Sequence, residues 1–146
     1  MKSSATADLA RSSALHVGFA CLAMGGWAVF ANRAHPLAPM LLAGLVQGLL
    51  SGAITLVLKR SLEAMAARLS GPFAFVLPPL ATCVVVLVVL LSAHRLAGTP
   101  EIWATIAVPY AVSSAYAWIY NAGLVIAGRR AAHGGVPSPR NQTAGP

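Results

Sequence analysis

The stretch AGLVQGLLSGAITLVLKR, residues 43–60, decides the fold of this chain. Together with the apolar residues before it, this run is long enough to cross a bilayer as a helix, which takes about 20 residues. Within it, Gly44, Gly48 and Gly52 recur every fourth residue and form two overlapping G-x-x-x-G units. Glycine ridges of this kind let two helix backbones approach closely in lipid. The stretch therefore predicts a membrane-spanning helix that contacts another helix through its glycines.

A polar edge runs beside the glycine ridge. Gln47, Ser51 and Thr55 also recur every fourth residue, about 100° around the helix from the glycines. An unpaired amide in hydrocarbon costs several kcal/mol, so we expect Gln47 to bond a polar group of a neighbouring helix. A ligand contact inside a polar cavity is the alternative interpretation. The expected partners in the last apolar run are a tyrosine hydroxyl, Ser113, Ser114 and Asn121.

The composition indicates that the solvent of this protein is lipid. Of its 146 residues, 58% are hydrophobic and 9% are charged, whereas soluble domains carry about 25% charged residues. A chain of this length cannot hide so much apolar surface in one core. We therefore expect an all-α integral membrane protein, a compact antiparallel bundle of four transmembrane helices that forms one domain over residues 14–127. Its spans are expected at about 14–32, 37–58, 73–94 and 102–127, between a flexible N-terminus at 1–13 and a disordered tail at 128–146.

The basic residues predict the orientation. Arg33 and Arg95 are the only two on one side of the predicted spans. The other side carries Lys2, Arg11, Lys59, Arg60, Arg68, Arg129, Arg130 and Arg140. Loops rich in Lys and Arg stay in the cytoplasm, so both termini are expected there, in a bacterial cell at the inner membrane.

The same residues predict partners. The basic residues form no patch with interleaved aromatic residues, so nucleic acid is not an expected partner. Those beside the spans are expected to attract anionic lipid headgroups. They are Lys59, Arg60, Arg68, Arg129 and Arg130.

Small residues also line the first span. Gly18, Cys21 and Gly25 follow steps of three and four, the period of a helix-packing stripe. With the glycine ridge, the predicted helix-packing residues are Gly18, Cys21, Gly25, Gly44, Gly48 and Gly52. Proline interrupts two later spans, where Pro79 and Pro109 are expected to free the carbonyls four residues earlier. Nearby Ser and Thr hydroxyls could satisfy those carbonyls.

Polar residues also gather in the two short connections on the weakly basic side. These residues are Asn32, Arg33, His35, His94, Arg95 and Glu101. A metal, haem or anionic-headgroup site is one interpretation of this predicted periplasmic cluster. The other interpretation is that these are histidines at the membrane interface beside arginines that extend toward the headgroups. No metal or cofactor is predicted.

Catalytic groups are missing from the predicted spans. No Asp or Glu lies within them, although cation-coupled transporters normally use one. No nucleophile stands with a base, so no enzyme is predicted. The expected function is a non-enzymatic accessory or assembly subunit that associates with itself or with a larger membrane complex through its Gly and small-residue faces. The alternative is a small dimeric carrier or pore for a lipid-linked, weakly polar or anionic solute, and a cofactor subunit using His35 and His94 is the least favoured.

Overall fold

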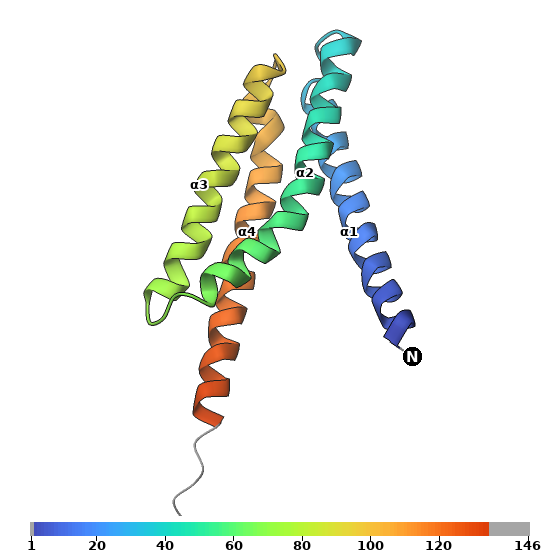
Figure 1. The fold of residues 1–146 in the computed structure, drawn as a ribbon. Coiled ribbons are helices and arrows are strands. Elements are labelled where there is room, and N and C mark those ends of the chain that lie inside the picture. Colours follow the sequence, from blue (N-terminus) through green and yellow to red (C-terminus); the bar gives the residue numbers. More distant parts are fainter. Residues whose placement is uncertain (1, 135–146) are drawn as a thin grey trace, which may run out of the picture.

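The described part of the chain consists of four long helices. A computed structural model describes residues 2–134, with side chains described for residues 14–131. The helices are α1 (Lys2–Ala31), α2 (Leu37–Ala66), α3 (Phe73–Leu96) and α4 (Ile102–Gly134), as Figure 1 shows. Each contains a stretch long and apolar enough to cross a membrane. The prediction of an all-helical chain with four candidate spans is confirmed.

The helices extend beyond the predicted spans. Residues 2–13, expected to be flexible, continue α1, and residues 128–134 continue α4. The α2 helix does not end at Leu58 but continues to Ala66, because Leu58 and Leu62 recur at helical spacing and are both buried. Of the predicted disordered tail, residues 135–146 lie outside the described residues.

The α2 helix is the centre of the arrangement, since it contacts each of the other three helices. The α3 and α4 helices pack together beside it, and α1 packs mainly against α2. We call the end with residues 32–36 and 97–101 the loop end, and the opposite end, with residues 67–72, the terminal end. Figure 1 shows α1 close to α2 near the loop end and separated from α2 and α4 toward the terminal end. In the same view, α2 crosses α4 obliquely as it approaches residues 67–72.

A small apolar core lies between α2, α3 and α4. It is formed by Leu58, Leu62, Val86, Leu90, Ile106 and Ala117. Many large apolar side chains point outward instead, including Phe19 at 74% exposure and Leu22 at 80%. This distribution is the one expected when lipid surrounds the helices, because hydrocarbon carries no penalty for an exposed leucine.

The start of α3 is stabilised by α4. Pro78 and Pro79 lack the amide hydrogens that the carbonyls of Ala74 and Phe75 would accept in a regular helix. Asn121, fully buried on α4, donates from Nδ2 to both carbonyls, at 2.9 and 3.0 Å. An amide on another helix therefore does what was predicted for Ser or Thr hydroxyls. These two hydrogen bonds of Asn121 fix the position of α4 against the weakened first turns of α3.

Candidate functional site: the lateral cleft

The glycine ridge of α2 contacts α1 of the same chain. A Cβ added at Gly25 would lie 2.9 Å from the carbonyl oxygen of Gly44, and one at Gly48 would lie 3.0 Å from that of Cys21. A Cβ at Gly52 would reach Cys21 Sγ at 2.6 Å. Five of the six predicted packing residues thus meet in one seam, which spans the loop-end half of α1.

Gly18 differs from the other packing residues. It continues the same stripe toward the terminal end, yet nothing lies within 4 Å of a Cβ added there. The packing role of Gly18 stays a prediction: Val17 beside it still approaches α2, at 3.4 Å from a Cβ added at Gly52, whereas Gly18 itself faces open space.

Gln47 belongs to a buried chain of hydrogen bonds between α2 and the end of α3. His94 Nε2 lies 2.8 Å from Gln47 Oε1, and Gln47 Nε2 donates to Ser51 Oγ at 2.8 Å. Because Oε1 can only accept, His94 Nε2 carries the hydrogen. In the neutral ring, Nδ1 then accepts from the Thr99 hydroxyl, 2.8 Å away. The prediction that Gln47 bonds a polar group of α4 is wrong. Its partner on a neighbouring helix is His94 of α3, a residue predicted to belong to the periplasmic cluster.

The end of α3 holds His94 in this place. Gly98 has φ of +64°, the left-handed conformation that glycine adopts readily after a helix. The backbone amide of Thr99 donates to the His94 carbonyl at 3.0 Å, and the backbone amide of Gly98 donates to the Arg95 carbonyl at 3.2 Å. This pair of bonds is a Schellman motif, so the same turn that ends α3 also brings the Thr99 hydroxyl to the imidazole.

Of the remaining intramembrane polar residues, Thr55 and Ser113 bond within their own helices, and Asn121 bonds the start of α3. Thr55 donates to the Ser51 carbonyl at 2.7 Å, and Ser113 donates to the Pro109 carbonyl at 2.8 Å. The Ser114 hydroxyl and Asn121 Oδ1 are buried without a described hydrogen-bond partner. The six polar residues therefore do not form a single lined path through the bundle.

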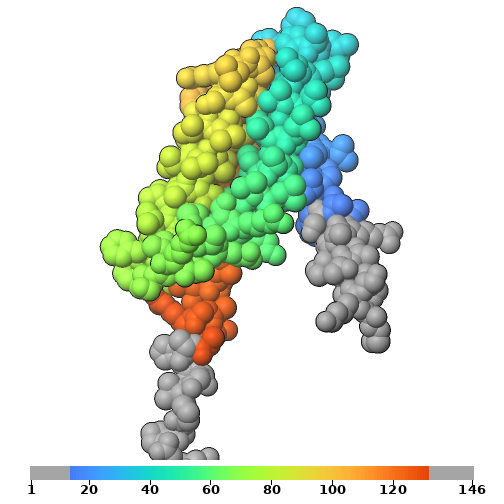
Figure 2. Space-filling view, in the orientation of Figure 1, coloured from blue at the N-terminus to red at the C-terminus, as the bar shows by residue number. Residues whose placement is uncertain are grey.

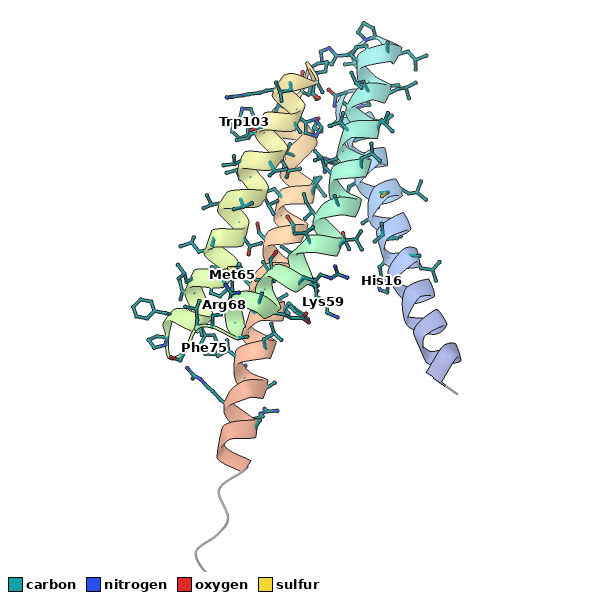
Figure 3. All side chains as sticks on the ribbon, viewed as in Figure 1. His16, Lys59, Met65, Arg68, Phe75 and Trp103 are labelled. Atoms are coloured by element: carbon teal, nitrogen blue, oxygen red, sulfur yellow. The ribbon has the colours of Figure 1, made fainter. Side chains whose placement is uncertain are left out.

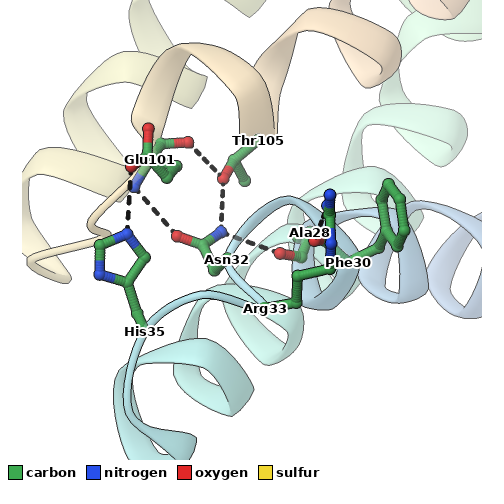
Figure 4. Close-up of polar contacts among 7 residues, drawn as sticks. All are labelled: Ala28, Phe30, Asn32, Arg33, His35, Glu101 and Thr105. Atoms are coloured by element: carbon green, nitrogen blue, oxygen red, sulfur yellow. Dashed lines mark hydrogen bonds and ion pairs between the residues drawn. The ribbon is translucent and has the colours of Figure 1, made fainter.

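Figure 4 shows a second polar network, at the loop end, that joins α1 to α4. Asn32 is fully buried, and its Nδ2 donates to the Ala28 carbonyl and to Thr105 Oγ1, both at 2.8 Å. Its Oδ1 accepts the amide of Glu101 at 3.0 Å, which satisfies a donor just before α4 begins. Trp27 adds a bond from Nε1 to the Ala104 carbonyl at 2.9 Å. The ends of α1 and α4 are thereby fixed to each other.

The predicted periplasmic cluster forms only in part. His35 pairs with Glu101 at 3.1 Å beside Asn32. Arg33 instead bends back over the Phe30 ring, 4.0 Å from its centroid, and Arg95 is exposed. His94 lies in the buried chain with Gln47. Among the residues whose side chains are described, no three His, Cys, Asp or Glu gather where they could hold a metal ion.

A cleft opens where α1 leaves the bundle. We call it the lateral cleft; it has a volume of about 700 Å³ and lies between α1, α2 and α4. Figure 2 shows the blue surface of α1 lying against the green surface of α2. Its inner end is lined by Met24, Ser51 and Pro109, and its walls carry Ala20, Ile54 and Val112.

The mouth of the lateral cleft, at the terminal end, is charged and aromatic. It is lined by His16, Lys59, Arg60, Glu63 and Tyr116. Figure 3 shows His16 on α1 and Lys59 on α2 on opposite sides of the gap. Glu63 Oε1 accepts the Tyr120 hydroxyl at 2.6 Å and lies 4.0 Å from Lys59 Nζ. The ring of Tyr120 stacks on that of Tyr116, with centroids 5.3 Å apart.

A second groove lacks these charges. It has a volume of about 420 Å³ and runs between α2 and α3, lined by residues such as Leu50, Val57, Val85 and Val89. Its only hydroxyl side chains are Ser61 and Thr82, and the Thr82 hydroxyl donates to the Pro78 carbonyl. This groove resembles the rest of the lipid-facing surface, whereas the lateral cleft combines an apolar interior with an ionic mouth.

The predicted basic residues are divided between the cleft and the surface. Lys59 and Arg60 line the mouth of the lateral cleft, whereas Arg68 and Arg130 are exposed elsewhere. Arg129 lies over the Phe75 ring, 4.7 Å from its centroid. Glu63 and Tyr116 were not predicted as site residues. Glu63 was missed because the second span was expected to end at Leu58, and Tyr116 because nothing in the sequence showed which face of the fourth span meets α2. The helical spacing of Leu58 and Leu62 is the signal that could have placed Glu63 on α2.

Comparison with protein-family models, with curated proteins and with solved structures finds no match to this chain. The function must therefore be argued from the residues of the lateral cleft.

Proposed function

We propose that this protein is a small, non-enzymatic, multi-pass membrane protein that binds an amphipathic, phosphate-bearing lipid or lipid-linked solute in its lateral cleft and acts as a carrier for it. The observation that carries the proposal is the polarity of the cleft, which changes from apolar at Met24 and Pro109 to ionic at Lys59 and Arg60. A phospholipid has the same sequence of properties from its acyl chain to its headgroup.

The dimensions of the cleft suit such a ligand. Its volume of about 700 Å³ lies within the range of about 300–1,000 Å³ that is usual for ligand sites. From Ser51 to Glu63 the rise along α2 is about 18 Å at 1.5 Å per residue. Half of the hydrocarbon core of a bilayer measures about 15 Å. A chain lying in the cleft would therefore reach from the headgroup level to the middle of the membrane.

The closed loop end supports a carrier or binding protein rather than a pore. Asn32 and Thr105 join α1 to α4 there, and the chain from Thr99 to Ser51 is buried. The lateral cleft thus opens sideways and toward the terminal end. With the distribution of Lys and Arg, we place the terminal end in the cytoplasm, in a bacterial cell at the inner membrane.

The accessory-subunit function loses the observation that first favoured it. The glycine ridge at Gly44, Gly48 and Gly52 contacts α1 of the same chain, so it is not free to receive another protein. An accessory subunit could still bind a helix of its partner protein in the lateral cleft. Crosslinking from the cleft wall distinguishes such a helix from a bound lipid.

The test fills the lateral cleft. Ala20 lines it on α1, whereas Leu22, on the same helix, points outward at 80% exposure. The wild-type protein, purified in mild detergent, should retain phospholipid in native mass spectrometry. Ala20→Trp should reduce that retention several-fold, and the control Leu22→Trp should leave it unchanged. Equal retention in all three proteins would contradict the proposal.

Photo-crosslinking identifies the occupant. A photoreactive residue at Val112, in the cleft wall, should crosslink to lipid after the surrounding lipid has been exchanged for detergent. The same group at Val84, which is exposed on α3 outside both grooves, should not. A protein crosslinked at Val112 in native membranes would favour the accessory subunit and overturn the carrier.

A further inference from the structure

The mouth of the lateral cleft carries charges of both signs on one face of α2. Lys59 and Glu63 are separated by one helical turn, and Arg60 lies beside them. Side chains three and four residues apart are neighbours on a helix surface, with Cβ atoms about 5–6 Å apart. A ligand whose phosphate reaches Lys59 and Arg60 therefore lies next to the carboxylate of Glu63.

This carboxylate disfavours a purely anionic headgroup and favours one with a cation. Both described contacts of Glu63, from Tyr120 and Lys59, are to Oε1, and 43% of its side chain is exposed. The second oxygen can therefore accept hydrogen bonds from a ligand. A like charge held beside Glu63 would be repelled, whereas an ammonium group would be attracted.

The aromatic residues add to this preference. The stacked rings of Tyr116 and Tyr120 lie next to Glu63, and Tyr116 lines the mouth. An ammonium ion is attracted to the face of a tyrosine ring as well as to a carboxylate. The same corner of the cleft thus offers two kinds of contact to a cation, while the basic side chains serve the phosphate.

Resting on the proposed function, we infer that the headgroup recognised at this mouth is zwitterionic, a phosphate joined by a short spacer to a primary ammonium, as in phosphatidylethanolamine. The phosphate binds Lys59 and Arg60, and the ammonium donates to Glu63 beside Tyr116. Phosphatidylglycerol has no cation for Glu63, and phosphatidylcholine has no N–H to donate.

The experiment measures headgroup choice separately from lipid retention. Delipidated protein in detergent is given equal amounts of phosphatidylethanolamine, phosphatidylglycerol and phosphatidylcholine, and the bound lipids are counted by native mass spectrometry. The wild type should prefer phosphatidylethanolamine to phosphatidylglycerol by about threefold to fivefold, the range that one partly exposed ion pair supplies. Its preference over phosphatidylcholine should be smaller, because phosphatidylcholine keeps the cation and lacks only the N–H donor. Glu63→Gln should retain as much lipid in total but lose this preference. The double substitution Lys59→Gln, Arg60→Gln should lower the binding of all three lipids.

Tyr120→Phe is the structural control. It removes the hydroxyl that donates to Glu63 but keeps the carboxylate and the ring, so the preference should persist. Normal retention with no headgroup preference, or a preference unchanged by Glu63→Gln, would overturn this inference and leave the proposed carrier standing. No retained lipid in the wild type, or retention that Ala20→Trp does not reduce, would overturn the proposed carrier itself.

Discussion

Neighbouring turns of α1 follow the same sequence pattern and have different surroundings. Near the loop end, Cys21 and Gly25 pack against the glycine ridge of α2 so closely that a Cβ at Gly25 would lie 2.9 Å from a carbonyl oxygen. One turn further from the loop end, Gly18 has nothing within 4 Å of such a Cβ. A small residue at the correct spacing is therefore insufficient for packing, because it must also face the partner helix, as Val17 beside Gly18 still does at Gly52.

Polar bonds account for part of this difference. The loop end holds α1 to α4 through Asn32, Trp27 and the pair of His35 with Glu101. At the terminal end α2 turns away across α4, and the lateral cleft takes the place of a helix contact. Three substitutions test this difference along α1, from the largest expected effect to the smallest.

Gly25→Leu should have the largest effect. Its side chain would meet the backbone of Gly44 and Gly48, neither of which can move without separating α1 from α2. Overpacking of this kind costs about 1–3 kcal/mol, and we expect the upper end of that range. The measurement is the free energy of unfolding in mixed micelles by denaturant titration. Gly26→Leu is the matched control, since a Cβ at the adjacent Gly26 meets nothing within 4 Å.

If both substitutions destabilised the protein equally, the cause would be the loss of glycine itself, and the close seam would be disproved.

Asn32→Leu should have an intermediate effect. It removes the bonds to Thr105 and Glu101 while keeping a side chain of similar size. Hydrogen bonds between membrane helices average about 0.6 kcal/mol each, so we expect a loss of about 1–2 kcal/mol in the free energy of unfolding. A double-mutant cycle with Thr105→Val measures the bond between these two side chains. A coupling energy of zero would show that the bond between Asn32 and Thr105 does not hold the two helices together.

Gly18→Leu should have the smallest effect, close to zero in the same unfolding measurement. The new side chain would enter open space beside the lateral cleft, and leucine is a better helix former than glycine by up to about 1 kcal/mol. A loss of more than about 1 kcal/mol would mean that the terminal-end half of α1 closes against a neighbour, as it does near the loop end.

The candidate site could be predicted only in part. Lys59 and Arg60 were predicted to bind lipid headgroups. Glu63 was not predicted as a site residue because the second span was expected to end before it, and Tyr116 was not because its face of the fourth span could not be assigned from the sequence. Gln47 was expected to have a polar partner, yet its partner His94 stands next to Arg95 in the sequence and looked like a loop residue. The predicted third span already reached residue 94, but nothing in the sequence shows that the turn at Gly98 would bury that histidine against Gln47.

By itself, the sequence determined the lipid environment, the number of helices and the close approach of α2 to another helix. These properties depend on composition and on local spacing, because a helix in lipid must contain its own backbone hydrogen bonds and packs closely only through small residues. Only the tertiary structure decided that the glycine ridge meets α1 of the same chain, that Asn121 compensates for Pro78 and Pro79, and that α1 leaves the bundle beside Lys59. Each of these depends on where one helix lies relative to another, and helices that are apolar on all sides carry few signals for that choice.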